Sequence, residues 1–306
     1  VEVARDGAVL HTPNAKEAKP GNTVFLTIDS RLQKVANESL AKAIQSSHQP
    51  ECIAGGVVAL SVKDFSVLAA ATYPSYDLAK LTEPGYYSQL ANDKANPLFN
   101  RAFQGAFAPG SIFKPLVACG ALEEGVLTTE DKIKCVGIYH YPGHNFTTKC
   151  LGVHGNADLN YAMAKSCNVY FSEAGRRLGI ENMNLYAKRF GLGVKTGIEL
   201  TETTGILAGP EYSRSIGSRW SNLVTIKAAI GQSDNQFSPL QLATYVATIA
   251  NGGNRYRPHL IRKITDYRRE NIVMENNPDS PELVETAGVS EEHLNMVKTA
   301  MRQVVL

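Results

Sequence analysis

The chain has 306 residues, 43% hydrophobic and 20% charged, which is typical of a globular protein with one large domain or two smaller ones. Its net charge of +2 is too small to indicate a nucleic-acid partner, and no apolar run approaches the ~18 residues of a membrane helix. The chain begins Val-Glu-Val, without Met or a signal peptide, and we interpret it as an excised piece of a longer chain.

The first predicted elements are a strand, a helix and a hairpin. Residues 1–22 are polar and irregular, and residues 23–28 are strand-like. A cap at Asp29 or Ser30 begins a helix. The apolar residues that repeat there at helical spacing are Leu32, Val35, Ala36, Leu40, Ala43 and Ile44. Residues 54–60 and 66–71 are predicted as two strands joined by a polar turn.

Helices dominate the rest of the prediction. A Pro-Gly turn before Ser111 precedes a helix through Leu122. Further helical patterns cover 158–178, 181–190, 238–250 and 289–306. The third of these begins with Ser238 and Pro239, a cap and then proline at the first helical position. Residues 133–155 carry Cys, His, Tyr and Gly, and predict a hairpin or loop.

A serine nucleophile needs a base, and the sequence favours lysine over histidine. No Gly-x-Ser-x-Gly occurs, and none of the seven histidines has such a neighbourhood. In a helix, residues i and i+3 share a face, so Ser-x-x-Lys at a helix start brings the two side chains together. Desolvation then lowers the lysine pKa, so that the neutral amine can take a proton.

Two Ser-x-x-Lys sequences occur. Ser39 to Lys42 lies inside an amphipathic helix, where polar residues usually only face solvent. Ser111 to Lys114 follows Pro-Gly and opens a helix, which exposes the serine near the positive end of the helix dipole. We therefore identify Ser111 as the candidate nucleophile and Lys114 as its base.

The surrounding sequence resembles class B penicillin-binding proteins, the D,D-transpeptidases of peptidoglycan synthesis. The resemblance is carried by Asn-Arg-Ala-Phe-Gln-Gly-Ala-Phe-Ala-Pro-Gly-Ser-Ile-Phe-Lys-Pro at 100–115 and, in the family's order, by residues 26–33, 59–78, 190–200 and 229–243. It implies a mixed α/β (α+β) fold of the penicillin-binding and serine β-lactamase type, with an antiparallel sheet flanked by helices and a helical subdomain.

The family's second motif is Ser-x-Asn, and two candidates exist. Ser233 to Asn235 spells the literal Ser-Asp-Asn, but it lies in a segment that resembles a different landmark of the family. Ser166 to Asn168 lies 55 residues after the nucleophile, near the family's usual interval. The resemblance implies that Ser166 relays protons between the lysine, the nucleophile and the leaving amine. It implies that Asn168 binds the substrate's amide backbone.

The family's third motif is Lys-Thr-Gly or Lys-Ser-Gly on an inner strand. Lys195 to Gly197 spells it, but in a segment where the family commonly has Thr-Gly without a catalytic lysine. The true motif follows the helix that resembles residues 291–305, and the chain stops at Leu306. We interpret 1–22 as a linker or the remnant of an N-terminal pedestal region, and 23–306 as a transpeptidase domain lacking its C-terminal strands. If Leu306 is the true end, we expect an inactive protein.

The resemblance implies an acyl-transferase that cross-links peptidoglycan stem peptides through a serine acyl-enzyme and is inhibited by β-lactam antibiotics. It implies a cell-membrane protein with an extracytoplasmic catalytic domain, an N-terminal anchor not contained here, and a glycosyltransferase partner in a division or elongation complex. Catalysis needs no cofactor. The alternatives are a D,D-carboxypeptidase or β-lactamase of the same fold, and a β-lactam sensor or scaffold without turnover.

Metal-ligating residues are dense between the first two motifs. Tetrahedral Zn²⁺ commonly takes four nitrogen or sulfur ligands from loops. We expect the ligands of a structural zinc to be Cys135, His140, His144 and Cys150, with His154 ranked lower because its His-Gly resembles a metal-free feature of the family. A Cys135–Cys150 disulfide, as in exported domains, or unlinked loop residues are the alternatives. The remaining cysteines lie far apart in the sequence and argue against a strongly oxidising environment.

Overall fold

The structure is a computed structural model that describes residues 2–11 and 19–306. Residues 1 and 12–18, part of the predicted linker or pedestal remnant at 1–22, lie outside the described residues. The chain divides into two compact units, one formed by residues 1–26 with 261–276 and the other by residues 27–260 with 277–306. The larger unit contains every candidate site residue.

The smaller unit is built from strands in its described residues. They form the antiparallel pair β1–β2 and a three-stranded antiparallel sheet in the order β12–β11–β3. The bounds are β1 (Glu2–Val3), β2 (Val9–His11), β3 (Thr23–Leu26), β11 (Ile261–Thr265) and β12 (Ile272–Glu275). The strand predicted at 23–28 is confirmed as β3, which ends at Leu26.

The larger unit contains the helices and the remaining strands of the described chain. Its α-helices are α1 (Ser30–Gln45), α2 (Tyr86–Asn92), α3 (Lys114–Glu123), α4 (Leu159–Ala164), α5 (Asn168–Arg189), α6 (Pro210–Ser215), α7 (Asn222–Ala229), α8 (Pro239–Ala250) and α9 (Glu291–Arg302). Two 3-10 helices are η1 (Leu78–Thr82) and η2 (Gly110–Phe113). The strands are β4 (Gly55–Leu60), β5 (Val67–Tyr73), β6 (Ile133–Cys135), β7 (Ile138–His140), β8 (Thr147–Lys149), β9 (Gly155–Ala157), β10 (Asn254–Tyr256) and β13 (Leu283–Thr286).

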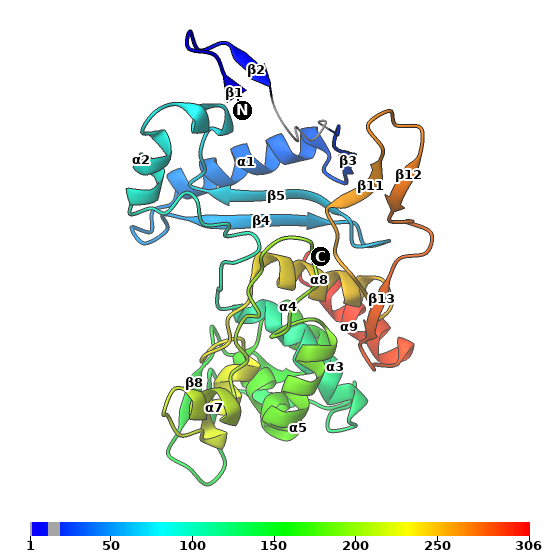
Figure 1. The fold of residues 1–306 in the computed structure, drawn as a ribbon. Coiled ribbons are helices and arrows are strands. Elements are labelled where there is room, and N and C mark those ends of the chain that lie inside the picture. The colour runs from blue at the N-terminus through cyan, green and yellow to red at the C-terminus, as the bar shows by residue number, and fades with distance from the viewer. Residues whose placement is uncertain (1, 12–18) are drawn as a thin grey trace. The chain divides into compact units, whose positions relative to one another are not determined.

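The β4–β5 hairpin lies between two helices, and it confirms the hairpin predicted from the sequence. α1 packs on one side of the pair and α8 contacts β4 from the other (Figure 1). α1 begins after Asp29, whose carboxylate accepts the backbone N–H groups of Arg31 and Leu32. α8 begins with the predicted cap, since the Ser238 and Gln241 side chains each bond to the other's backbone N–H.

The main core lies among the helices in the lower half of Figure 1, where α5 packs against both α3 and α7. Its fully buried residues include Phe113, Leu116 and Phe171. Lys114 is buried with them, at 1% exposure. A buried ammonium group is costly unless hydrogen bonds surround it, so the partners of Lys114 locate the candidate site.

The helix predicted over 158–178 is wrong in its middle. α4 ends at Ala164 and α5 begins at Asn168, because Ser166 between them has a φ of +50°, which an α-helix cannot contain. The predicted separation of this helix from the one at 181–190 is confirmed by Gly179, whose φ of +78° kinks α5. The helix predicted at 289–306 is α9, which ends earlier, at Arg302.

Residues 133–157 form two nested antiparallel pairs, in agreement with the predicted hairpin. β7 pairs with β8 as the inner hairpin, and β6 pairs with β9 around it. This nesting brings the chain just after β8 close to the end of β6. Cysteines stand at both of these places, Cys135 at the end of β6 and Cys150 just after β8.

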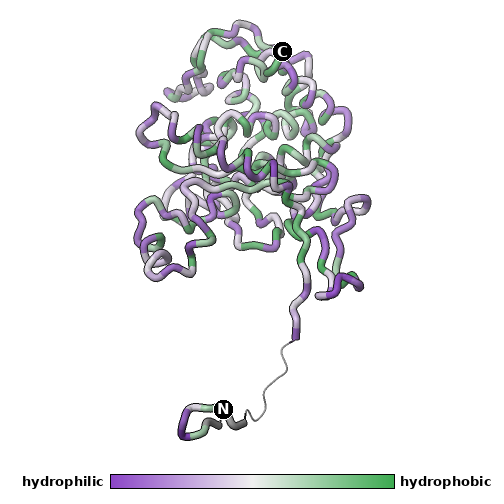
Figure 2. The backbone as a smooth tube through the Cα atoms, turned by 90° about the horizontal axis from the view of Figure 1, so that it is seen from above, coloured by the Kyte–Doolittle hydropathy of each residue, from purple (hydrophilic) through white to green (hydrophobic). Residues whose placement is uncertain are grey.

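No helix of the described residues is both long and apolar enough to cross a bilayer. Hydrophobic and hydrophilic stretches alternate at short intervals along the backbone (Figure 2).

Candidate active site

Ser111 and Lys114 lie one helical turn apart at the start of a helix. Ser111 is part of η2, which continues directly into α3 at Lys114. Pro115 follows at an early helical position, where its missing N–H has no intrahelical partner to lose. Ser111 is exposed, whereas Lys114 is buried with its Nζ 5.6 Å from the centre of the Phe171 ring. The candidate nucleophile thus faces solvent and the candidate base lies inside.

Three hydrogen bonds surround the Lys114 ammonium. Nζ donates to the backbone carbonyl of Ser166 at 2.7 Å, to Ser166 Oγ at 2.9 Å and to Asn168 Oδ1 at 2.8 Å. Ser166 Oγ in turn donates to Ser111 Oγ at 2.8 Å. The structure therefore brings all four predicted catalytic residues together, and this hydrogen-bonded path from Lys114 to Ser111 runs through Ser166.

The environment of Lys114 lowers its pKa. Burial disfavours the charged ammonium and lowers the pKa to about 8, while the thiolate forms of Cys150 and Cys167 would act in the opposite direction. A lysine with such a pKa is neutral in a substantial fraction of molecules near neutral pH. It can therefore accept a proton, as a general base must.

Ser166 occupies a strained backbone position. Its φ is +50°, in the left-handed region that costs a non-glycine residue of order 1 kcal/mol. The turn is closed by hydrogen bonds from the Ser166 N–H to Met163 O at 3.0 Å and from the Cys167 N–H to Ala162 O at 2.8 Å. This turn between α4 and α5 places Ser166 Oγ in contact with both Lys114 and Ser111.

Asn168, the first residue of α5, is fixed at both ends of its side-chain amide. Oδ1 accepts a hydrogen bond from Lys114, and Nδ2 donates to Lys149 O at 3.0 Å. In this state the side chain positions the lysine. The predicted contact between Asn168 and a substrate amide stays a prediction.

The literal Ser-Asp-Asn at 233–235 has a structural role: its Asn235 side chain hydrogen-bonds to the backbone of two neighbouring segments. Asn235 is 1% exposed, its Oδ1 accepts the Ala208 N–H at 2.9 Å, and its Nδ2 donates to Ala228 O at 3.1 Å. Both ends of this amide are thus committed to the backbone. The structure gives Asn235 no part in the hydrogen-bonded path between Lys114 and Ser111.

Two further segments match a family motif in sequence but lie outside the hydrogen-bonded path between Lys114 and Ser111: residues 195–197 and 39–42. In Lys195-Thr196-Gly197, the Glu202 carboxylate accepts the N–H groups of Thr196 and Gly197, both at 2.9 Å, and the Thr196 hydroxyl at 2.8 Å. These bonds close a local turn and leave Lys195 exposed. The first Ser-x-x-Lys, at 39–42, has both polar side chains exposed on α1.

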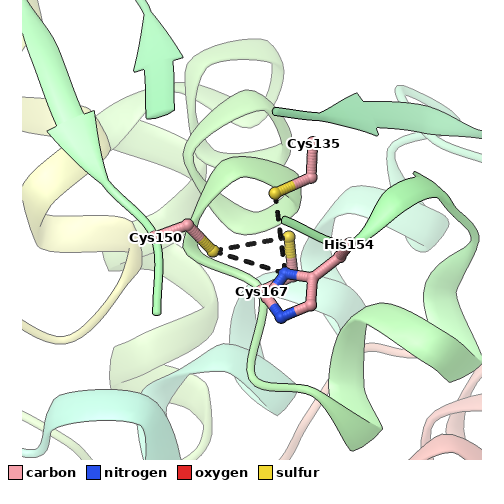
Figure 3. Close-up of side chains that lie close together, drawn as sticks. All are labelled: Cys135, Cys150, His154 and Cys167. Atoms are coloured by element: carbon pink, nitrogen blue, oxygen red, sulfur yellow. Dashed lines mark hydrogen bonds between the residues drawn. The ribbon is translucent and has the colours of Figure 1, made fainter. Parts of the chain in front are cut away.

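Three thiols and one imidazole converge next to the second motif. The ligand atoms of Cys135, Cys150, His154 and Cys167 all lie within 4.8 Å of one another. Figure 3 shows the four side chains pointing toward one another. His154 Nδ1 lies 3.5 Å from both Cys135 Sγ and Cys150 Sγ, and the sulfurs of Cys150 and Cys167 are 3.9 Å apart.

These separations fit a tetrahedral metal site. Zinc bound at about 2.3 Å to sulfur and about 2.0 Å to nitrogen separates two sulfurs by roughly 3.8 Å, and a sulfur from a nitrogen by roughly 3.5 Å. A disulfide needs its sulfurs at about 2.05 Å, and all five cysteines carry free thiols. The Cys135–Cys150 disulfide considered from the sequence is therefore not formed in this structure.

The predicted ligand set needs correction at two of its members. His140 and His144 are exposed and do not join the cluster. In β7 the alternation of side chains buries Tyr139 and turns His140 outward, and His144 lies in the turn of the inner hairpin, stacked edge-on against Tyr141. The ligands that the structure brings together are Cys135 and Cys150, as predicted, with His154 and Cys167.

Sequence reasoning missed Cys167 because the search for ligands was confined to the segment before the second motif, between Cys135 and His154. A signal was present, since Cys167 lies between Ser166 and Asn168. A cysteine inside a second motif is necessarily close to whatever that motif contacts. His154 was set aside because of its resemblance to a metal-free His-Gly, and its place just before β9 brings it to the cluster.

The geometry of Ser111, Ser166 and Lys114 is that of serine acyl-transferases in which lysine, in place of histidine, activates the hydroxyl. Residues 55–306 match the family described as the penicillin binding protein transpeptidase domain. The chain belongs to this family.

One relative is a peptidoglycan D,D-transpeptidase MrdA of Acinetobacter baumannii, 32% identical over 313 aligned residues. The alignment covers 100% of this chain and 44% of that relative, so the chain spans less than half of the relative's length. A second MrdA, of Haemophilus influenzae, is 35% identical over 86% of this chain and 40% of its own length.

Solved structures share the fold. The penicillin G acyl-enzyme of penicillin-binding protein A from M. tuberculosis has a TM-score of 0.79 at 26% identity, covering 93% of this chain and 64% of that one. A structure described as the coordination of polymerization and crosslinking by a peptidoglycan synthase complex has a TM-score of 0.79 at 29% identity, covering 100% of this chain and 53% of that one.

Proposed function

We propose that the protein containing this chain is a serine-type D,D-transpeptidase that cross-links peptidoglycan stem peptides and is acylated by β-lactams. The observation that carries the proposal is the continuous hydrogen-bonded path from the buried Lys114 through Ser166 Oγ to the exposed Ser111 Oγ. Family membership over residues 55–306 supports it.

The path suggests how the hydroxyl is activated. When Lys114 is neutral, the same two hydrogen bonds run in the opposite direction, so that Nζ takes the Ser166 proton while Ser166 Oγ takes the proton of Ser111. Ser111 Oγ attacks the carbonyl carbon of the penultimate D-Ala, the amide C–N bond breaks, and the terminal D-Ala leaves as an amine that receives the proton back. The Ser111 backbone N–H is one donor available to the developing oxyanion.

The acyl-enzyme then meets the amine of a neighbouring stem peptide. Attack of that nitrogen on the acyl carbon forms the new amide, which is the cross-link, and breaks the ester bond to Ser111 Oγ. The proton lost by the amine returns to the Ser111 oxygen through the same path. A β-lactam opens its ring amide against Ser111 in the same way. Its leaving nitrogen stays tethered to the acyl group and so remains in the site.

Labelling of the intact protein with a fluorescent penicillin tests the proposal. We expect a covalent adduct in the native protein and none in Ser111→Ala, because the alanine has no oxygen to acylate. Labelling that persists in Ser111→Ala would contradict the nucleophile. Turnover with stem peptides then shows whether an amine or water takes the acyl group from Ser111. An amide product supports cross-linking, and a hydrolysed product indicates a carboxypeptidase or β-lactamase.

We further propose that the protein acts at the outer face of the cytoplasmic membrane beside a glycosyltransferase. The support is the likeness to a structure whose description joins polymerization and crosslinking in one synthase complex. A membrane-impermeant fluorescent penicillin should label the protein in intact cells. Labelling that appears only after lysis would contradict this location.

We also propose that Cys135, Cys150, His154 and Cys167 hold a structural zinc ion. Support comes from the donor set, three sulfurs and one imidazole nitrogen at near-tetrahedral separations. The ion would tie β6, the end of β8 and the start of α5 together. Elemental analysis of protein purified without added metal should give one zinc per chain, and a Cys150–Cys167 disulfide in its place would contradict the site.

A further inference from the structure

Residues 228–237 contact the turn that carries Ser111, which is η2 (Gly110–Phe113) with the residues just before it and is called the serine turn below. The N–H of Gly110 donates to the carbonyl of Gly231 at 2.9 Å. Phe107 and Phe237 exchange both backbone hydrogen bonds, at 3.0 and 2.9 Å, as an isolated antiparallel bridge. The serine turn is therefore fixed by backbone pairing on its N-terminal side, in addition to its continuity with α3.

Side chains hold the same turn from the other end. The Tyr245 hydroxyl donates to the carbonyl of Ile112, the residue after Ser111, at 3.2 Å. Phe113 stacks on Phe237 with ring centroids 6.0 Å apart. Tyr245 is fully buried, at 0% exposure, so water cannot replace its hydrogen bond if the turn moves.

Gly231 allows the closest of these approaches. Its φ is +72°, and a Cβ built on it would lie 1.9 Å from Gly110 O, 2.6 Å from Gly110 C and 2.7 Å from Gly110 N. Because these are backbone atoms of the serine turn, they cannot move aside as a flexible side chain would. A side chain at 231 must therefore displace the residue next to the nucleophile.

The supporting segment is itself anchored at two points. Asn235 Oδ1 accepts the Ala208 N–H, as described above, and Gln236 exchanges backbone hydrogen bonds with Ile206 at 2.7 and 3.0 Å. Gly231 thus contacts the serine turn from a fixed support. Residues 233–235, whose Ser-Asp-Asn sequence matches the second motif literally, are part of this supporting segment.

We propose that Gly231 and Tyr245 are positioning residues for the nucleophile. They hold the turn so that Ser111 Oγ stays within hydrogen-bond reach of Ser166 Oγ, now 2.8 Å away. Neither residue touches the reacting atoms, and the inference rests on the proposed acylation of Ser111. A displacement of about 1 Å at a reacting atom costs roughly 100-fold in rate, so their loss should slow the chemical step specifically.

The test compares two glycines of nearly equal φ, +72° and +70°, in the intact protein. Acylation by fluorescent penicillin is followed at several concentrations, so that the limiting rate constant and the half-saturation concentration are separated. We expect Gly231→Ala to lower the limiting rate constant by at least about 10-fold, with half-saturation nearly unchanged. Gly217→Ala has the same strain, at φ +70°, but its Cβ meets nothing within 4 Å, so it should acylate at the native rate.

A second pair keeps the proposal testable if Gly231→Ala does not fold. Tyr245→Phe removes only the hydroxyl that bonds to Ile112, and it should lower the limiting rate constant by roughly 3- to 10-fold. Tyr186→Phe removes the hydroxyl of another buried tyrosine, which donates to Glu124 at 2.8 Å, and it should leave the rate constant unchanged.

The outcomes separate this inference from the proposed function. A native limiting rate constant in both Tyr245→Phe and any folded Gly231→Ala would overturn the inference while the native protein still labels. A native protein that takes no penicillin would overturn the proposed function, and the inference with it. An equal loss of rate in Tyr186→Phe would show that a general loss of stability is the cause, which also overturns the inference.

Discussion

The sulfur of Cys150 accepts a hydrogen bond from the backbone N–H of Asn168 at 3.2 Å. Cys167 lies immediately before Asn168 and immediately after Ser166. One candidate metal ligand, Cys167, therefore belongs to the same three-residue turn as the hydrogen-bond partners of Lys114, and a second, Cys150, bonds directly to that turn. The turn therefore links the thiol cluster to the two side chains, Ser166 and Asn168, that accept hydrogen bonds from Lys114.

This connection predicts that metal loss impairs acylation. His154→Ala should lose most of its zinc and should acylate about 10-fold or more slowly, because loss of a ligand frees the turn that positions Lys114. Zinc content by elemental analysis and the acylation rate constant are measured on the same preparation. His144→Ala, an exposed histidine outside the cluster, should keep both at native values. Loss of zinc in His144→Ala but not in His154→Ala would restore the ligand set inferred from spacing.

Removal of the relay hydroxyl should slow acylation strongly. Ser166→Ala breaks the path between Lys114 and Ser111, and we expect a loss of about 100-fold or more in the rate constant. Ser172→Ala is a matched control, since its buried hydroxyl on α5 has no hydrogen-bond partner. It should acylate normally. A near-native rate in Ser166→Ala would indicate direct proton transfer between Lys114 and Ser111.

The rate of acylation should rise with pH through about 8, the pKa of Lys114. The base acts in its neutral form, whose fraction grows from about one tenth at pH 7 to about nine tenths at pH 9. The profile is measured with a β-lactam between pH 6 and 10. Lys114→Arg should lose the rise and most of the activity, because the guanidinium stays protonated throughout this range. A flat profile in the native protein would contradict a lysine base.

Glu173 should make the stability of the larger unit depend on acid pH. Burial would raise its pKa, but hydrogen bonds from Arg176, Arg177 and Tyr139 lower it to about 2. The folded pKa lies below the unfolded value of 4.5, so the carboxylate stabilises the fold above pH 4.5, and this stability is lost as the pH falls toward 2. Glu173→Gln should lower the free energy of unfolding at pH 7 by about 3 kcal/mol and flatten the acid limb.

Chemical denaturation between pH 2 and 7 measures this effect. Glu38→Gln is the control, because its pair with Lys34 spans 3.9 Å between exposed side chains. An exposed pair of this kind contributes under about 0.5 kcal/mol. An equal effect of both substitutions would contradict the assigned role of the Glu173 cluster.

Lys195→Ala should leave acylation unchanged, although it removes the lysine of a literal Lys-Thr-Gly. The lysine is exposed, and the Thr196 and Gly197 N–H groups are occupied by Glu202. The acylation rate constant of the intact protein checks this. A loss of about 10-fold or more would make this segment part of the active site.

Much of the fold could be predicted from local sequence. Apolar spacing located α1 and the β4–β5 hairpin, and the Ser238 cap with its proline located the start of α8. The break at Ser166 could not be predicted this way, because the periodicity of 158–178 is helical on both sides of it. Its positive φ is stabilised by contacts with Lys114, which lies far away along the chain.

The candidate site shows the same division. Ser111 and Lys114 were found because the i, i+3 relation on a helix is local. Only two of the four residues in the thiol and imidazole cluster, Cys135 and Cys150, were predicted from the sequence, because spacing alone does not say which side of a strand a residue faces. In the structure Tyr139 occupies the buried side of β7. His140, the next residue, therefore faces solvent and does not reach the cluster.

The thiol and imidazole cluster and the support of Ser111 differ in the sequence separation of the residues that form them. The four candidate metal ligands lie between residues 135 and 167, so a metal held there would close only short loops, whose entropic cost is small. The support of the serine turn comes from Gly231 and Tyr245, more than a hundred residues beyond the nucleophile (the Tyr245 to Ile112 contact spans 133). Metal closure would thus add local order to the segment with Ser166 and Asn168, which also contacts Lys114 across 52 residues, whereas the position of Ser111 depends on contacts of still higher sequence separation, which form late and slowly.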